Sequence, residues 1–249
     1  MPESIHSSNE QAFTEFCQQD NFGCRILSSY RYDPNDITNT VMITVQDGTI
    51  QNAFSLKGGS AVVCGSESAE ETLQALRFLG CRDIFASRKF FEDAALSFDS
   101  EGFCACLNSA VPPMATETVT AETLRELYPV IQDMLPAYDR NMTGNWYVEL
   151  SHKLRHNTCH AEAVRVNNRL VSAALTAAES ETAAVIGMVS TLPGFRGNGF
   201  AGTVCLSLAH SLLSDGKKVY ICCEKDLLPF YEKLGWRCCG EWQQLRIKN

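Results

Sequence analysis

The sequence has no long hydrophobic run, no excess of basic residues and no dense framework of cysteines. Nowhere do eighteen apolar residues follow one another, and the first residues, MPESIHSSNEQ, hold no basic segment followed by an apolar one. Neither a transmembrane helix nor a secretion signal is therefore expected. Twelve cysteines are scattered along 249 residues, a length that builds a core without disulfides. We expect a cytoplasmic protein whose cysteines are reduced and mostly buried.

Acidic residues outnumber basic ones, and the excess lies in the first part of the chain. The formal net charge is −8. Residues 1–115 hold 7 Lys and Arg against 15 Asp and Glu, whereas residues 116–249 hold 14 of each kind. This balance argues against nucleic acid as the main partner. The neutral second part is the better host for an anionic ligand.

Hydrophobic periodicity predicts an α/β protein with a mixed sheet of the α+β type. In the first half it predicts helices over residues 8–20, 68–79 and 88–97, and strands over 41–46, 49–56, 60–65, 83–87 and 102–109. Ser68 and Glu71 would form a capping box at the start of the second helix. The segment AVPPMAT, with two prolines, predicts a linker.

The second half repeats this order of elements with different residues. It predicts helices over 120–134, 143–156, 199–213 and 227–235, and strands over 160–166, 169–177, 182–191, 217–223 and from Trp236 onward. Each half ends in strand, helix, strand, helix and strand, which indicates a weak internal duplication. We therefore predict domains over residues 1–113 and 114–249.

The segment TLPGFRGNGFAG, at residues 191–202, fits two cofactor motifs. From Gly197 onward it spells G-x-G-x-x-G, typical of dinucleotide sites, and from Arg196 onward it spells R-x-x-G-x-A, typical of a coenzyme A pyrophosphate loop. The dinucleotide motif needs its first glycine at the end of the strand, but five residues intervene. After Glu224 only 25 residues remain, too few for a second mononucleotide half.

The coenzyme A interpretation has neither problem. Gly197 and Gly199 let the backbone bend with its N–H groups inward, and the next helix begins there, so its positive end faces the loop. Residues 182–214 contain no Asp or Glu, and Arg196 is their only fixed charge. The sequence therefore predicts an anion site at this loop, with an ordinary glycine turn as the alternative.

Two segments of the second half, MVSTLPGFRGNGFAGTVCLSLA and LLPFYEKLGW, resemble the GNAT superfamily of acyl-CoA N-acyltransferases. The resemblance covers about residues 116–249 and implies a GNAT fold there; the first half is similar only in its order of elements, as in a degenerate GNAT-like copy. In place of PGFRGNGFAG the first half has CGSESAEE. Its carboxylates, at Glu67, Glu70 and Glu71, would repel a phosphate, so the first half is expected to bind no coenzyme A.

The resemblance implies roles for particular residues. Tyr231 matches the tyrosine that protonates the departing thiolate, although a half-buried aromatic packing residue is the alternative. The side chains of Phe200 and Leu206 are expected to pack the helix more than to contact ligand. The residues expected to hold acetyl-CoA are Val189, Ser190, Thr191, Arg196, Gly197, Asn198, Gly199, Phe200 and Ala201.

The general base is less well defined. Many relatives carry a glutamate in the strand before the loop, but AAVIGMV has none. Glu149 and Glu162 are our candidates for the catalytic carboxylate; Glu179, Glu181 or a water molecule are alternatives. An aromatic wall with a carboxylate suits a cationic amine. The residues expected on the acceptor side are Trp146, Tyr147, His152 and Glu224.

Further clusters were weighed as metal sites. His152, His156 and His160 recur every fourth residue beside Cys159, but residues 157–158 are expected to end the helix before His160, and we predict no metal. The adjacent pairs Cys222-Cys223 and Cys238-Cys239 are expected in the core.

The predicted activity is transfer of an acetyl group from acetyl-CoA to a primary amine of a small molecule or peptide, by direct attack. A non-catalytic acyl-CoA-binding sensor and, further off, an NAD-dependent oxidoreductase are the alternatives. The expected partners are coenzyme A and a small amine. No nucleic acid or membrane partner is expected, and a homodimer is left open.

Overall fold

The computed structural model describes residues 2–32, 39–65, 70–91, 96–109, 111–132 and 146–247. It divides the chain into two compact units. Unit 1 comprises Met1–Cys104, Cys222–Leu228 and Cys238–Asn249, and unit 2 comprises Ala105–Ile221 and Pro229–Arg237. Each unit is mixed α/β, as predicted. The boundary after residue 113, which the sequence analysis places between the two repeats, stays a prediction.

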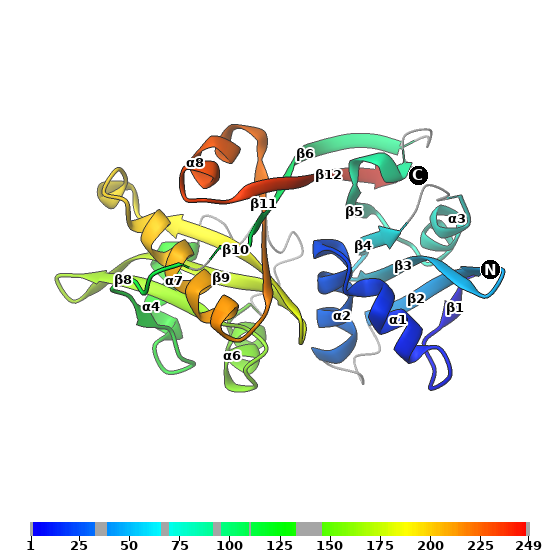
Figure 1. The fold of residues 1–249 in the computed structure, drawn as a ribbon, viewed down its shortest axis with the longest axis horizontal. Helices are drawn as coiled ribbons and strands as arrows, with labels where there is room; N and C mark the ends of the chain where they lie inside the picture. Colours follow the sequence, from blue (N-terminus) through cyan, green and yellow to red (C-terminus); the bar gives the residue numbers. More distant parts are fainter. Residues whose placement is uncertain are drawn as a thin grey trace. The chain divides into compact units, whose positions relative to one another are not determined.

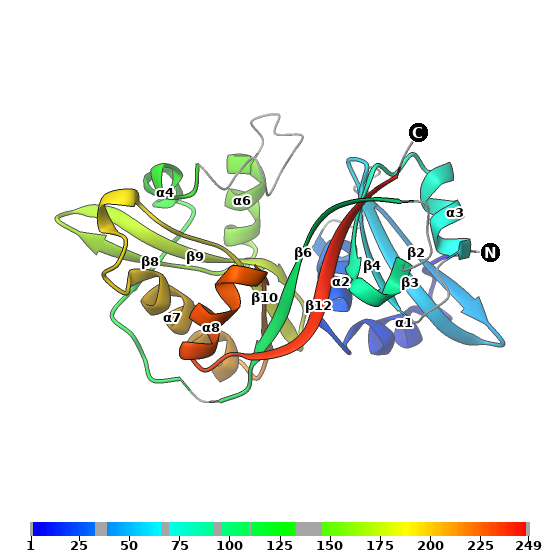
Figure 2. The same cartoon turned by 90° about the horizontal axis from the view of Figure 1, so that it is seen from above.

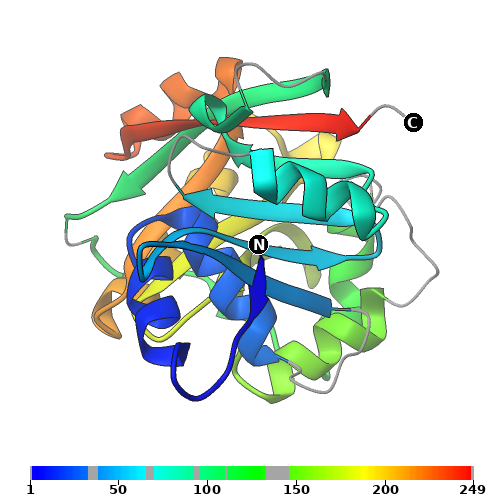
Figure 3. The same cartoon turned by 90° about the vertical axis from the view of Figure 1, so that its right-hand side faces the viewer.

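Unit 1 is built on strands β1 to β5 in chain order, followed by β12. The strand pairs are antiparallel except β4 and β5, which are parallel, and Figure 3 shows β2, β3 and β4 side by side in blue to cyan. The elements are β1 (Glu3–Ser4), α1 (Glu10–Cys17), α2 (Asn21–Tyr32), β2 (Asn39–Gln46), β3 (Thr49–Lys57), β4 (Ser60–Gly65), α3 (Glu70–Phe78), β5 (Asp83–Ser87), the 3-10 helix η1 (Arg88–Phe91), β6 (Leu96–Leu107) and β12 (Arg237–Ile247).

Both faces of this sheet are covered, because neighbouring residues of one strand enter different cores. Phe54 packs with Leu76 of α3, whereas the adjacent Ala53 packs with Phe13 of α1 and Ile26 of α2. Helix α3 therefore covers one face, and α1 and α2 cover the other.

Unit 2 has the strand order β11, β10, β9, β8 and β7. Strand β10 is parallel to β11 and antiparallel to β9, which is antiparallel to β8. The elements are β7 (Glu117–Thr118), α4 (Leu124–Ile131), α6 (Trp146–Arg155), β8 (Ala161–Val166), β9 (Arg169–Glu179), β10 (Ala183–Thr191), η2 (Pro193–Phe195), α7 (Phe200–Ser214), β11 (Lys218–Glu224) and α8 (Leu228–Lys233). From Cys222 onward β11 belongs to unit 1, as does the 3-10 helix η3 (Lys225–Leu227).

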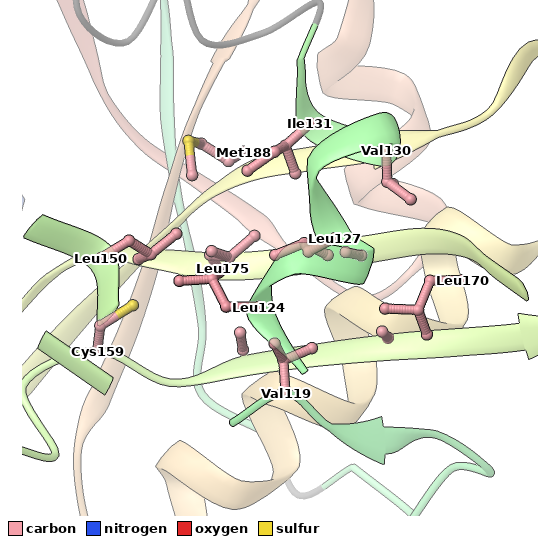
Figure 4. Packing of buried hydrophobic residues seen from close by; sticks show 13 residues of the cluster. Val119, Leu124, Leu127, Val130, Ile131, Leu150, Cys159, Leu170, Leu175 and Met188 are labelled. Carbon is pink, nitrogen blue, oxygen red and sulfur yellow. The ribbon is translucent and has the colours of Figure 1, made fainter. Parts of the chain in front are cut away.

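Helices cover both faces of strands β8 to β10 (Figures 1 and 2). Helix α7 packs on all three strands from one side, and α4, with α6 beside it, packs from the other. Figure 4 shows the α4 side, where Leu124 and Leu127 lie against Leu175 of β9. Every one of these three side chains is fully buried. This core fixes the strand ends from which the candidate site is built.

Three sequence predictions need correction. The helix over residues 88–97 is wrong, because only the short η1 forms, β6 already begins at Leu96, and 92–95 lie outside the described residues. Helix α2 was missed. Cys238 and Cys239 are exposed and not in the core. The predicted cap at Ser68 also lies outside the described residues.

No helix among the described residues is both long and apolar enough to span a bilayer.

Candidate coenzyme A site

The candidate site begins where β10 ends. Residues 193–195 form one turn of 3-10 helix, and Gly197 and Gly199 follow with φ of 80° and 79°. Positive φ favours glycine, so both glycines are needed for this backbone path. A Cβ at either position would meet nothing within 4 Å, which leaves the outer side of the loop open. The two glycines thus fix the conformation of the loop, and its outer face is open to a ligand.

Helix α7 starts at this loop with unsatisfied backbone donors. Gly199 is its N-cap and, being glycine, provides no side-chain cap. The first helical bond is donated by the Thr203 N–H to the Gly199 carbonyl, at 3.0 Å. The N–H groups of residues 200–202 therefore have no partner within the helix, and with the helix dipole they form an anion-binding end.

Two side chains hold the loop from inside. Arg196 donates through Nε to the Thr191 carbonyl at 3.1 Å, and its terminal nitrogens remain for a ligand on the exposed side. Asn198 donates through Nδ2 to the carbonyls of Phe195, at 3.0 Å, and Arg196, at 3.2 Å. These bonds engage loop carbonyls, whose oxygens would otherwise repel an anion.

Strand β10 is bulged just before the loop. Gly187 lies opposite Leu175 of β9 but Ser190 lies opposite Ala173, so β10 carries one extra residue here. Met188 adopts φ of 47°, a strained value for a side chain of this kind. The bulge takes Val189 out of regular pairing with β9. The chain thus changes direction at the residue expected to contact the cofactor.

Ser172 of β9 braces this bulge and was not identified from the sequence. Its hydroxyl donates to the Ser190 carbonyl at 2.9 Å and lies 2.8 Å from the Thr191 hydroxyl. Ser172 is fully buried. A lone serine in an apolar strand gives no sequence signal for this role, because its partners are eighteen or more residues away.

The parallel ladder of β10 with β11 covers Ala183 to Ile186, opposite Lys218 to Ile221. Strand β10 then continues to Thr191 while paired with β9 on its other side. The antiparallel pairs of β10 with β9 and of β9 with β8 also differ from the mostly parallel sheet of a dinucleotide fold, which argues against the G-x-G-x-x-G interpretation.

Tyr231 lies on α8 and is buried, with 6% of its surface exposed. Its ring meets that of Trp236 edge-on, with centroids 6.3 Å apart. The segment is tied to α7 through Leu234, since a Cβ on Gly202 would lie 3.1 Å from Leu234 Cδ2. The third glycine of the loop thus lets the segment that follows α8 pack closely against the first turn of α7, and Tyr231 lies three residues before Leu234 on that anchored segment.

Glu162 is buried on the α7 side of β8. One carboxylate oxygen accepts from Thr116 at 2.6 Å and the other from Thr118 at 2.8 Å. The Thr116 hydroxyl also lies 2.6 Å from that of Ser207 on α7, whereas the neighbouring Ala161 packs in the α4 core. Both oxygens of Glu162 therefore have hydroxyl partners, which explains a buried carboxylate without catalysis.

Glu149 and the acceptor candidates of α6 lie on the opposite face from Glu162. Glu149 is half-buried and pairs with Lys153 at 3.4 Å. Tyr147 packs against the α4 core, with Arg125 over its ring, while His152 is exposed and stacks on His156 at 4.2 Å. The two candidate bases are thus not brought together. For Trp146, the first residue of α6, only the backbone is described.

Glu224 ends β11 and is the N-cap of η3, but its side chain makes no cap hydrogen bond and is exposed. The prediction that α6 ends before His160 is confirmed: the helix stops at Arg155 and Asn157 has positive φ. Among the described residues no group of three His, Cys, Asp or Glu could hold a metal ion.

A buried ionic cluster lies at the far end of the same strands. Glu179 accepts hydrogen bonds from His160 at 2.8 Å, Lys217 at 2.6 Å and Thr176 at 2.6 Å. Burial raises the pKa of Glu179, but these hydrogen bonds outweigh it and hold the pKa below its ordinary value. The bond to Glu179 raises the pKa of His160. The cluster joins the start of β8, the end of β9 and the start of β11, at the other end of β10 from the loop.

Comparison with known proteins shows which family model and which solved structures this chain resembles. The family model described as FR47-like protein matches residues 166–247. No curated protein is similar enough in sequence to match.

Solved structures match over nearly the whole chain. A protein from Novosphingobium aromaticivorans assigned to the GNAT acetyltransferase family is 14% identical, with a TM-score of 0.58 over 92% of this chain and 100% of that one. An acetyltransferase of the GNAT family from Colwellia psychrerythraea is 12% identical, with 0.58 over 100% of both chains. A tandem GNAT protein from the clavulanic acid biosynthesis pathway is 13% identical, with 0.58 over 99% and 97%. The predicted GNAT fold and tandem organisation are confirmed.

Proposed function

We propose that this chain is an acyl-CoA-dependent N-acyltransferase that moves an acetyl group from acetyl-CoA to a primary amine. The observation that carries the proposal is the loop at residues 191–202. It combines two glycines of positive φ, an unsatisfied helix N-terminus and Arg196 in a stretch without acidic residues. These are the properties that a pyrophosphate requires. A structural turn alone would need neither the arginine nor the absence of acids.

In this proposal the cofactor lies along the end of β10. The pyrophosphate binds the N–H groups of residues 197–201 and the terminal nitrogens of Arg196. The pantetheine arm pairs with the backbone of residues 189–191, beyond the ladder with β11. The bulge supports this assignment because it frees Val189 from regular pairing with β9. The same backbone would polarise the thioester carbonyl.

Tyr231 is proposed as the acid that protonates the departing thiolate of coenzyme A. The contact between Leu234 and Gly202 supports this role because it ties the helix of Tyr231 to the start of α7. A phenol O–H is a donor that can pass its proton to a departing thiolate. The amine attacks the thioester directly, so no acyl-cysteine forms.

The acceptor is proposed to be a cationic primary amine recognised by α6. Tyr147 is proposed as its aromatic partner and Glu149 as its half-exposed carboxylate partner. Trp146, of which the backbone alone is described, stays a predicted acceptor residue. His152 is exposed and completes the proposed acceptor residues of α6. Glu224 belongs to unit 1, and its role on the acceptor side stays a prediction. Glu149 is the better candidate base than Glu162, because both oxygens of Glu162 already have hydroxyl partners. A cytoplasmic location and a homodimer stay predictions.

A sensor that binds acyl-CoA without turnover is the second candidate. It is favoured by β10, which has no acidic side chain between Ala183 and Thr191. The deciding experiment measures release of free thiol from acetyl-CoA with polyamines, amino acids, aminoglycosides and peptide N-termini. Release with any one amine supports the enzyme. Binding of acetyl-CoA without release across the panel supports the sensor, and no binding at all contradicts both.

The first half is proposed to bind no coenzyme A. In the position of the loop, α3 begins with Glu70 and Glu71, both exposed, so its N-terminus already faces two negative charges. Residues 66–69, which include Glu67, lie outside the described part of the chain. A binding stoichiometry of one cofactor per chain is expected, and two would contradict this assignment.

A further inference from the structure

Two thiols lie side by side within unit 1, away from the candidate loop. Cys104 is in β6 and Cys222 is near the end of the neighbouring strand β11, and their sulfur atoms are 3.8 Å apart. Cys104 is buried, whereas Cys222 is partly accessible. A disulfide requires sulfur atoms about 2 Å apart, so oxidation would bring these two sulfur atoms closer by about 2 Å.

Helix α2 places polar groups against this pair. Cys222 donates to Asn21 Oδ1 at 3.3 Å, and Asn21 is buried with 3% exposure. The Arg25 guanidinium lies over the Phe85 ring at 5.2 Å, and its Nε is buried without a hydrogen-bond partner among the described residues. A buried cationic donor without an acceptor costs free energy, and an anion at Cys222 would provide the acceptor.

The two thiols differ in acidity. The hydrogen bond from Cys104 lowers the pKa of Cys222, burial opposes this, and the charge of Arg25 lowers it further, to about 7. The pKa of Cys104 is raised by that hydrogen bond and by burial. The negative charge of Asp20 raises the pKa of Cys222 and so opposes the thiolate. The Asp20 carboxylate accepts a hydrogen bond from the Gly23 N–H at 2.8 Å. The thiolate, which is the nucleophilic form, therefore resides on Cys222.

We propose that Cys222 and Cys104 form a peroxide-sensitive dithiol, with Cys222 as the attacking thiolate and Cys104 as the resolving thiol. The Cys222 sulfur attacks the terminal oxygen of a hydroperoxide. A sulfur–oxygen bond forms, the oxygen–oxygen bond breaks, and the departing alkoxide or hydroxide takes a proton from water. Cys222 is oxidised by two electrons to a sulfenic acid, and the peroxide is reduced.

Resolution needs no second reagent. The Cys104 sulfur attacks the sulfenic sulfur, the sulfur–sulfur bond forms and the sulfur–oxygen bond breaks. The leaving hydroxide takes the proton of the Cys104 thiol and becomes water. Two thiols and one hydroperoxide thus give one disulfide, one alcohol or water, and one further water. Because Cys222 is only partly accessible, a small hydroperoxide can reach its sulfur atom, whereas a bulky disulfide reagent would need a fully exposed sulfur atom.

The test exposes the full-length reduced protein to limiting hydrogen peroxide, blocks remaining thiols, and maps peptides by mass spectrometry without reduction. The expected product is one cross-linked peptide pair containing Cys104 and Cys222, formed at least tenfold faster than oxidation of the exposed Cys238. Cys104→Ser should leave a sulfenic acid at Cys222 that a cyclic 1,3-diketone traps. Cys222→Ser should leave Cys104 reduced.

Controls separate this pair from its neighbours. Cys238→Ser should keep the cross-link at its wild-type rate. Cys239→Ser should also keep it, although the Cys239 thiol donates to the Cys104 carbonyl at 3.4 Å. Arg25→Gln should slow oxidation of Cys222 several-fold. Oxidation of Cys238 ahead of Cys222 in the native wild type, or a cross-link to Cys239 in its place, would overturn the proposal without any variant having to fold. The result is independent of whether coenzyme A binds.

Discussion

Gly202, in the first turn of α7, is packed so closely against Leu234 that a Cβ would lie 3.1 Å from its Cδ2. This contact ties the segment that carries Tyr231 to the start of the helix that closes the candidate cofactor loop. It gives a glycine of the loop a packing role independent of any ligand.

We expect Gly202→Val to displace Leu234 and, with it, Tyr231. Turnover should fall about tenfold or more, because small displacements of a catalytic group are costly. Affinity for coenzyme A should change less, since the N–H groups of the loop remain. Steady-state kinetics and calorimetric titration give the two values. The matched control is Gly240→Val in β12, where a Cβ meets nothing within 4 Å. Equal losses in both variants would contradict the packing role.

Arg196→Glu should weaken coenzyme A binding roughly 10- to 100-fold, because a charge-assisted contact is replaced by repulsion. The thermal shift that saturating coenzyme A produces should disappear. Arg169→Glu makes the same charge change at an exposed position of β9 and should preserve the shift. A preserved shift in Arg196→Glu would remove the loop as the pyrophosphate site.

Tyr231→Phe should lower kcat by about 100-fold and leave the affinity for coenzyme A nearly unchanged, because general acid catalysis contributes on that scale. Rapid-mix measurement of thiol release gives the rate. Tyr128→Phe, at a half-exposed tyrosine of α4, is the control. An unchanged rate would show that another group protonates the thiolate.

The cluster of Glu179, His160 and Lys217 predicts a pH dependence of stability. The raised pKa of His160 adds stability that is complete below its ordinary value of 6.5 and is lost as pH rises through the raised value. The lowered pKa of Glu179 adds stability that is present above its ordinary value of 4.5 and is lost as pH falls through the lowered value. Both contributions are present between about pH 4.5 and 6.5.

Urea unfolding across pH 4 to 9 tests this dependence. Glu179→Gln should cost about 3 kcal/mol near pH 6, because it leaves Lys217 in a buried site without its partner. Glu181→Gln, exposed two residues further along the chain, should cost under about 1 kcal/mol. A pH profile that is the same in wild type and Glu179→Gln would assign the dependence to other groups.

Local sequence signals predicted the strands and turns well where one residue type decides the backbone. The Asp47-Gly48 and Asn167-Asn168 turns take positive φ and join the expected hairpins, and the glycine loop follows its strand. Helix α2 was not predicted from the sequence because Gly23 and two serines lower its helix propensity. Gly23 is there for packing, since a Cβ would lie 2.0 Å from the Cys17 carbonyl oxygen.

In the candidate site, too, the features set by local sequence were predicted and those set by contacts between distant residues were not. Arg196 and the glycines are visible because the loop is contiguous in sequence. Ser172 and Leu234 are not, because each acts through a contact that only the folded chain creates. Glu162 is the opposite case: a lone acid in an apolar strand is conspicuous in the sequence, and two threonine hydroxyls are enough to account for its burial, so its catalytic role stays a prediction.

The pairing of β5 with β12 affects the folding of unit 1 while the chain is being synthesised. Its residues 83–87 pair with residues 242–246 of β12, so unit 1 is begun first and finished last. While the intervening chain is being made, Ile84, Phe85 and Ala86 line a strand edge without its partner, and such edges recruit other chains. A nascent chain halted before β12 is therefore the form of this protein most exposed to misassembly and most in need of a chaperone.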